Sequence, residues 1–210
     1  MVPLHYLLPA IIASALAFAA PARAESVIAE WENVKAPPPP ALKPVTVDAK
    51  TTALVVLDMT NQFCGPQRYA QCPEMVPTVK KLLAEARAKG AMVVFTSIPN
   101  VGKSEIIKDL EPSGNEHLIQ SFLDKFLNSD LEKTLRDKGV TTIIITGLAA
   151  NGAVLYTSSE AAQKGFTIVV PVDAITAMTR YAEQFSVWQL GNAPIISTKL
   201  TLTKSDMIKF

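Results

Sequence analysis

Histidine and cysteine are scarce in this chain of 210 residues, which contains two of each. His5 lies in an apolar N-terminal segment and His117 stands alone, so no histidine cluster is available to bind a transition metal. Gly147 and Gly152 do not follow the spacing of phosphate-binding glycine loops. We therefore expect no metal and no cofactor, although a metal site made of carboxylates alone stays open.

An excess of charge of either sign is also missing, because 20 Lys and Arg residues balance 19 Asp and Glu residues. A chain without a basic surface has no electrostatic attraction for nucleic acid or anionic lipid, so neither is an expected partner. Hydrophobic side chains make up 49% of the sequence, which suits one compact domain with a well-filled core.

The apolar segment near the N-terminus is too short for a comfortable membrane span. Residues 6–20 are almost wholly apolar, and Ala22-Arg23-Ala24 matches the small-x-small pattern that signal peptidase reads. We expect a signal peptide at 1–24, cleavage before Glu25, and a protein secreted to the bacterial periplasm without a stable membrane anchor. Because no Lys or Arg precedes the apolar segment, an uncleaved N-terminal anchor is the alternative.

Residues 25–50 are expected to form a proline-rich arm ahead of a domain at 51–210. The run Pro37-Pro38-Pro39-Pro40 favours polyproline II, which acts as a semi-rigid spacer or lies over a neighbouring surface. Trp31 in this arm indicates docking, and we expect a homo-oligomer.

Predicted strands and helices alternate along the domain. The strands are expected at 53–58, 91–97, 118–121, 140–146, 166–170 and 194–200, and the helices at 74–89, 129–138, from about 151, and at 178–190. Alternation of this kind implies right-handed crossovers and a mostly parallel sheet covered by helices on both faces. The expected fold is therefore a three-layer α/β/α sandwich.

The fourth strand is expected to lead into the reactive part of the site. Residues 142–146 are apolar or β-branched throughout, as in strands buried on both faces of a parallel sheet. Gly147 then turns the chain into a helix that starts near Asn151, where the helix dipole attracts negative charge. A thiol just inside such a helix has a lowered pKa, but the residue there is Ala153.

Two motifs resemble those of the isochorismatase-like cysteine hydrolases, which include nicotinamidases and N-carbamoyl amidohydrolases. They are LVVLDMTNQF at 54–63 and FLNSDLEKTLRDKGVTTIIITG at 126–147. The resemblance spans about residues 50–200 and implies a six-stranded sheet of order 3-2-1-4-5-6, so that strands one, three and four end at a common edge. It also implies an Asp, Lys, Cys triad, and Asp58 matches its Asp.

Two triad members are absent from the positions that the resemblance assigns to them. The lysine falls on Gln120, or on Ser121 if one residue has been inserted. The cysteine falls on Ala153. Loss of a triad nucleophile generally costs several orders of magnitude in rate, so the thiol mechanism does not carry over. Lys125 is close in sequence, but its side chain would have to turn back towards the site.

Cys64 and Cys72 flank a short polar loop after the first strand. In an oxidising compartment such a pair is most simply a disulfide, which would contribute about 2–3 kcal/mol to stability. The alternative is that Cys64, close to Asp58 in sequence, serves as a displaced nucleophile.

The other polar candidates lie just after a strand or in the first turn of a helix. Those assigned to ligand binding are Asn61, Asp124, Asn151 and Tyr156. Those assigned to catalysis are Asp58, Gln120 and Ser121, around the vacant nucleophile position at Ala153. Asn151 is also expected to cap its helix. Burial, without a cationic neighbour, is expected to raise the pKa of Asp58.

Three functions stay open for a chain with these features. The first is a hydrolase of small amide-like molecules in which Asp58 activates water or Ser121 instead of a thiol. The second is a binding module that captures a small ligand without turnover. The third is an assembly protein, in which the oligomer surface and the arm matter more than the pocket.

Overall fold

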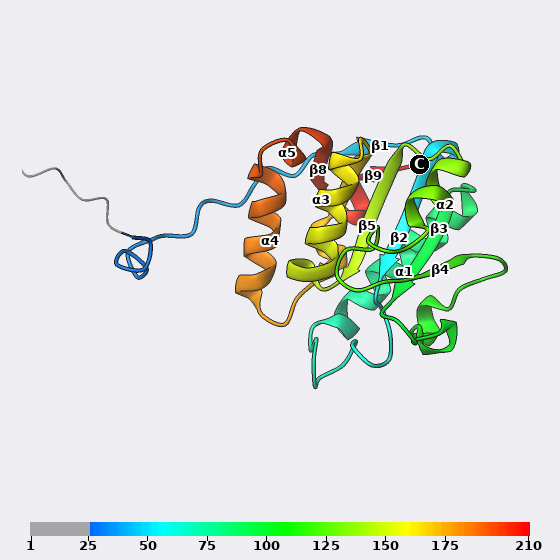
Figure 1. Cartoon of the computed structure of the whole chain (residues 1–210), viewed down its shortest axis with the longest axis horizontal. Coiled ribbons are helices and arrows are strands. Elements are labelled where there is room, and N and C mark those ends of the chain that lie inside the picture. Colours follow the sequence, from blue (N-terminus) through cyan, green and yellow to red (C-terminus); the bar gives the residue numbers. More distant parts are fainter. Residues whose placement is uncertain (1–25) are drawn as a thin grey trace, which may run out of the picture. The chain divides into compact units, whose positions relative to one another are not determined.

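The computed structural model describes residues 26–210 and is shown in Figure 1. The predicted signal peptide at 1–24 lies outside the described residues. The chain divides into two compact units between Pro38 and Pro39, and each is described by itself. The described part of the first unit consists of turns at 27–33 followed by a segment without regular structure. The second unit, Pro39–Phe210, contains the sheet and its helices.

Among the described residues, parallel strands form a central sheet in the order β4-β3-β2-β5-β6-β8. The strands are β2 (Thr52–Leu57), β3 (Met92–Ser97), β4 (His117–Gln120), β5 (Thr142–Leu148), β6 (Thr167–Pro171) and β8 (Leu200–Thr203). A short strand, β7 (Ile175–Thr176), pairs with the end of β5. Numbered along the chain, the main strands have the order 3-2-1-4-5-6, which confirms the predicted fold.

Helices cover both faces of the sheet (Figure 1). They are α1 (Cys72–Ala88), α2 (Leu131–Asp137), α3 (Leu155–Gln163), α4 (Arg180–Asn192) and α5 (Ile196–Lys199). Side chains of β2 alternate between the two faces, since Leu54 and Val56 pack with α1 while Val55 and Leu57 pack with α2, α3 and α4. A strand buried on both sides explains the continuous apolar run in the sequence.

Two predicted boundaries differ in the structure. Residues 196–199 form α5, and the last main strand starts at Leu200 instead of within 194–200. The Pro194 carbonyl accepts a hydrogen bond from the Ile196 N–H in a turn, and Ile195 has a φ of +70°, which extended strand backbone does not adopt. The folded unit also starts before residue 51, because β1 (Val45–Thr46) pairs with β9 (Ile208–Lys209).

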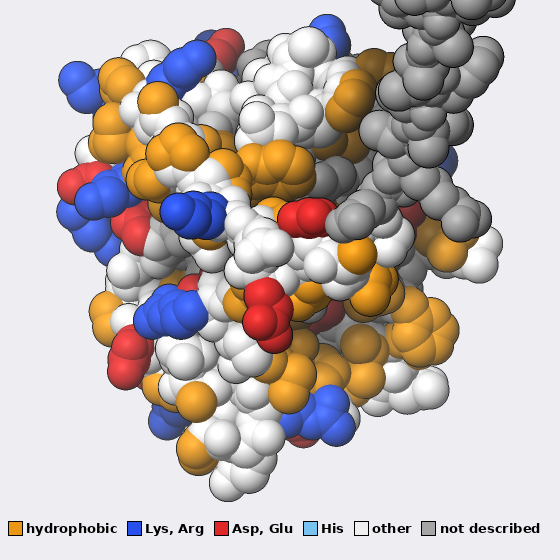
Figure 2. Space-filling view, turned by 90° about the vertical axis from the view of Figure 1, so that its left-hand side faces the viewer, with side chains coloured by type: hydrophobic (Ala, Val, Ile, Leu, Met, Phe, Trp, Pro, Cys, Tyr) orange, Lys and Arg blue, Asp and Glu red, His pale blue; other side chains and the backbone are white. Residues whose placement is uncertain are grey.

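Helix α4 presents aromatic side chains to the surface. Tyr181, Phe185 and Trp188 recur at the spacing of one helix face, and each is at least 39% exposed. Figure 2 views the side of Figure 1 that carries α4, and hydrophobic side chains lie there between charged ones. Within residues 26–210, none of the helices is both long and apolar enough to cross a membrane.

Candidate functional site

Asp58 directly follows β2 at the carboxyl edge of the sheet. Its φ of +51° lies in the left-handed region, which Asp tolerates better than most residues. Thr96 of β3 donates a hydrogen bond to Asp58 Oδ1 over 2.8 Å and accepts one from the Asp58 N–H over 3.3 Å. Two neighbouring strands therefore fix the direction of this buried carboxylate.

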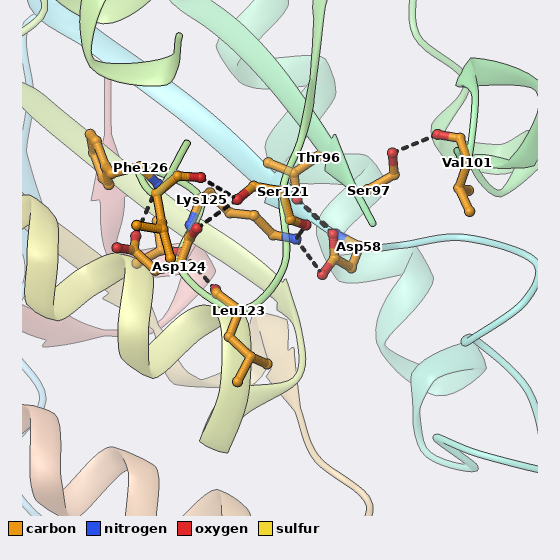
Figure 3. A network of polar contacts seen from close by, with 11 residues as sticks. Asp58, Thr96, Ser97, Val101, Ser121, Leu123, Asp124, Lys125 and Phe126 are labelled. Atoms are coloured by element: carbon orange, nitrogen blue, oxygen red, sulfur yellow. Dashed lines mark hydrogen bonds and ion pairs between the residues drawn. The ribbon is translucent and has the colours of Figure 1, made fainter. Parts of the chain in front are cut away.

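Lys125 supplies the cation of the site, which corrects the expectation that the lysine is lost. Its Nζ lies 2.8 Å from Asp58 Oδ2, and its side chain is 0% exposed (Figure 3). Nζ also donates a hydrogen bond to the Ser121 carbonyl over 2.9 Å. The loop after β4 turns the Lys125 side chain back towards the sheet. The sequence did not predict this turn.

Two hydroxyl groups hold this loop in place. Ser121 Oγ lies 2.7 Å from the Leu127 carbonyl and 2.9 Å from the Asp124 carbonyl, so its proton serves the loop backbone. Thr157 of α3 accepts a hydrogen bond from the Lys125 N–H over 3.1 Å. Ser121 is therefore a structural residue in this arrangement, and it does not line the hollow next to Asp58.

Burial affects both members of the ion pair. Loss of water raises the pKa of Asp58 above its ordinary value, although Lys125 and Thr96 act in the opposite direction. Burial likewise lowers the pKa of Lys125, against the attraction of Asp58. The expected direction for Asp58 is confirmed, but with a cationic neighbour present. The neutral form of each group is thus more accessible than in water.

A hollow of about 130 Å³ opens beside Asp58. Its lining is mostly apolar and consists of Asp58, Phe63, Tyr69, Ile98, Phe122, Leu123, Leu148, Ala149 and Ala153. This volume is below the range of roughly 300–1,000 Å³ typical of drug-sized ligands, so the hollow suits a small molecule. Among these lining residues, the polar side-chain groups are the Asp58 carboxylate and the Tyr69 hydroxyl, and none is Ser, Thr or Cys.

Ala153 occupies the position where a nucleophile would be expected. It lies in a helical turn, Ala150–Val154, that joins β5 to α3 and is kinked at Gly152. The methyl group is buried at 2% exposure and lines the same hollow as Asp58. A methyl group offers neither a lone pair nor a proton, so nucleophilic attack from this position is excluded.

Most of the other predicted residues lie away from the hollow. Gln120 is exposed and donates a hydrogen bond to the Val101 carbonyl over 2.8 Å. The Asp124 carboxylate accepts a hydrogen bond from the Phe126 N–H over 2.9 Å, and burial raises its pKa. Neither lines the hollow. The ligand-binding role given to Asp124 and the catalytic role given to Gln120 therefore find no support in this geometry.

Asn61, Asn151 and Tyr156 are all exposed and do not line the hollow either. Asn151 lies inside the helical turn, and the residue at its N-cap is Ala149, so the predicted capping role is wrong. Because the turn is kinked, a helix start that looks continuous in the sequence is displaced to Leu155.

A disulfide joins Cys64 to Cys72, as predicted. The loop between them carries Tyr69, whose ring packs edge to face on Phe63 with centroids 6.3 Å apart. Both rings line the hollow. Sequence reasoning missed these aromatic residues, although their place beside the disulfide, directly after the Asp58 strand, was a signal. Since both cysteines are bonded, Cys64 is no free nucleophile.

No three His, Cys, Asp or Glu side chains within residues 26–210 are grouped closely enough to hold a metal ion. Residues 52–199 match the family model of the isochorismatase domain. This chain belongs to the isochorismatase family.

Individual relatives place the chain within that family. It is 30% identical over 164 residues to the uncharacterized isochorismatase family protein YecD of Escherichia coli O157:H7, covering 66% of this chain and 85% of that one. It is 24% identical to N-carbamoylsarcosine amidase from Arthrobacter sp, over 67% of this chain and 65% of the amidase. The chain thus spans slightly less than two thirds of the amidase.

Solved structures agree in fold. A cysteine hydrolase from Pseudomonas syringae pv. phaseolicola 1448A has a TM-score of 0.69 at 21% identity, covering 80% of this chain and 94% of that chain. The nicotinamidase of Staphylococcus aureus has a TM-score of 0.65 at 16% identity, over 74% and 99% of the two chains. At these identities the likeness concerns the fold alone.

Proposed function

We propose that this member of the isochorismatase family captures a small amide-like molecule in the hollow beside Asp58 and does not hydrolyse it by thiol chemistry. The observation that carries the proposal is Ala153, whose methyl group faces the same hollow as the buried Asp58 carboxylate. Names such as N-carbamoylsarcosine amidase and ureidoacrylate amidohydrolase among the relatives support an amide-like ligand.

The polar groups of the site fit an amide. A carboxylate that lines an apolar hollow can accept hydrogen bonds from an amide N–H₂ group, and the apolar lining can contact the rest of the molecule. Lys125 forms an ion pair with Asp58 but does not line the hollow itself. The carboxylate is therefore kept in place to meet a ligand, while none of the described lining residues supplies a Ser, Thr or Cys nucleophile.

Ligand-dependent thermal stabilisation tests this proposal, because a molecule that binds only the folded state raises the melting temperature. The probes are nicotinamide, N-carbamoylsarcosine, ureidoacrylate and simple amides, with hydrolysis followed in parallel. Leu123→Trp should abolish the stabilisation by closing the mouth of the hollow, since Leu123 lines it and is 55% exposed. Leu127→Trp is the matched control, because Leu127 is 58% exposed on the same loop but does not line the hollow.

A hydrolase without a thiol is the second candidate, and the intact Asp58 and Lys125 pair favours it. A buried ion pair is costly to maintain, and a base with a raised pKa is suited to activating water near neutral pH. In that case wild-type protein would hydrolyse an amide probe, and Asp58→Asn would abolish the reaction. Turnover that survives Asp58→Asn would rule out Asp58 as the base.

Export to the periplasm and homo-oligomerisation remain proposals. Export is supported by the apolar segment at 6–20 followed by Ala22-Arg23-Ala24, and N-terminal sequencing of cell-derived protein should begin at Glu25. A product that starts at Met1 would contradict it. The exposed aromatic face of α4 supports an oligomer, and light scattering at several protein concentrations would reveal a monomer if this is wrong.

A further inference from the structure

The loop closed by the Cys64–Cys72 disulfide forms one wall of the hollow. It carries Tyr69, and Phe63 directly precedes it. The Phe63 and Tyr69 rings pack edge to face at an interplanar angle of 88°, so this wall of the hollow is aromatic. Irregular surface loops are generally more mobile than helices and strands. The disulfide limits the conformations of this loop and thereby restrains the wall.

Tyr69 also provides the second polar group of the hollow. Burial raises the pKa of its hydroxyl, and the charge of Asp58 acts in the same direction. Tyr69 and Asp58 both line the hollow, so one small ligand can contact both residues. An uncharged amide has one donor group and one acceptor group, which complement the Asp58 carboxylate and the Tyr69 hydroxyl.

Among the described residues that line the hollow, none carries a cation that could receive a carboxylate. Lys125 is paired with Asp58 and is not among the lining residues. Arg68 stacks over the Phe63 ring, with its guanidinium carbon 5.4 Å from the ring centroid. Arg68 is exposed and does not line the hollow. A carboxylate ligand buried next to Asp58 would lose its hydration and would be repelled by the like charge, and both effects weaken its binding.

We propose that this pocket is selective for uncharged amides over the corresponding carboxylates, and that the disulfide-bonded loop positions the amide through Tyr69. This inference rests on the proposed ligand-binding function and names the ligand class that the same hollow accepts. It also assigns Tyr69 as a residue that positions the ligand and the disulfide as the restraint that holds Tyr69 in place.

Calorimetric titration with matched pairs of probes tests the selectivity. The pairs are benzamide and benzoate, nicotinamide and nicotinate, and isobutyramide and isobutyrate. Each amide should bind the wild-type protein at least about tenfold more tightly than its acid. Acids that bind as tightly as their amides would overturn this inference and leave the binding function standing. If none of the probes, charged or uncharged, binds, the proposed function itself fails.

Variants of the loop test its part in amide binding. Tyr69→Phe keeps the ring but loses the hydroxyl and should weaken amide binding, whereas Tyr69→Ala should weaken it about tenfold or more. The double variant Cys64→Ser/Cys72→Ser should weaken it similarly while far-ultraviolet circular dichroism stays native. Tyr156→Ala is the control, since Tyr156 is exposed and outside the lining, and should bind amides normally. Unchanged amide binding in Tyr69→Ala would overturn the role of the loop.

Discussion

Lys125 Nζ lies 2.8 Å from Asp58 Oδ2, and this contact joins an irregular loop to the end of a central strand. Both groups are almost fully buried, so each would be costly without the other. The pair therefore couples the conformation of the loop to the position of the Asp58 carboxylate in the hollow. Its stability and its pH dependence give direct tests of the site.

Removing the cation should destabilise the fold strongly. Lys125→Met leaves Asp58 buried without its partner, and we expect a loss of about 3–5 kcal/mol in the free energy of unfolding, measured by urea denaturation. The double variant Asp58→Asn/Lys125→Met should recover most of this loss. Lys80→Met is the control, because the Lys80 and Asp109 pair is exposed and should change stability little. A small effect of Lys125→Met would contradict a tightly buried pair.

The pair should also make stability depend on pH. Because burial raises the pKa of Asp58 in the folded state, its contribution to stability is fully present below 3.8 and is lost as pH rises through the folded-state pKa. The lowered pKa of Lys125 gives a contribution that is present above 10.5 and is lost as pH falls through the folded-state pKa.

Denaturation of wild type and of Asp58→Asn/Lys125→Met between about pH 4 and about pH 8 measures this dependence, since other groups cancel in the difference. Relative to the double variant, wild type should lose stability as pH rises from the acid end. A relative gain of stability over the same range would show that attraction to Lys125 outweighs the burial of Asp58.

The sequence predicted the strands and the disulfide because both depend on local signals. Apolar β-branched runs and turn residues mark each strand, and the family motif supplies their order. The position of Lys125 was missed because the loop after β4 has no periodic pattern. Hydrogen bonds of Ser121 and Thr157 fold that loop back onto the sheet. Counting along the sequence therefore placed the lysine at Gln120, which faces Val101 instead.

Gly147 should tolerate no side chain, because β5 approaches β2 closely just before Asp58. A Cβ at this position would lie 2.1 Å from the Leu57 carbonyl oxygen, and the residue has a φ of +104°. We expect Gly147→Ala to cost more than about 3 kcal/mol in the free energy of unfolding. Gly165→Ala, at a φ of +88° in open space, should cost only about 1–2 kcal/mol. Equal losses would contradict the close approach.

The disulfide should contribute measurably to stability. Replacing both cysteines by Ser removes a short loop closure, and we expect a loss of about 2–3 kcal/mol in the free energy of unfolding. Peptide mapping without reductant should recover one Cys64–Cys72 peptide and no free thiol. Rapid alkylation of Cys64 in the native protein would instead indicate a reactive thiolate and contradict the bridge.

The site keeps the buried Asp58 and Lys125 pair but has no nucleophile at Ala153. The most direct measurement is the rate of hydrolysis of an amide that binds the hollow, compared among wild type, Ala153→Cys and Ala149→Cys. Ala149 lines the same hollow, so it controls for a thiol placed nearby. We expect background hydrolysis in wild type and Ala149→Cys, and a gain of roughly a hundredfold or more in Ala153→Cys that Lys125→Met removes. Hydrolysis by wild type as fast as by Ala153→Cys would show that the site does not depend on a nucleophile at position 153.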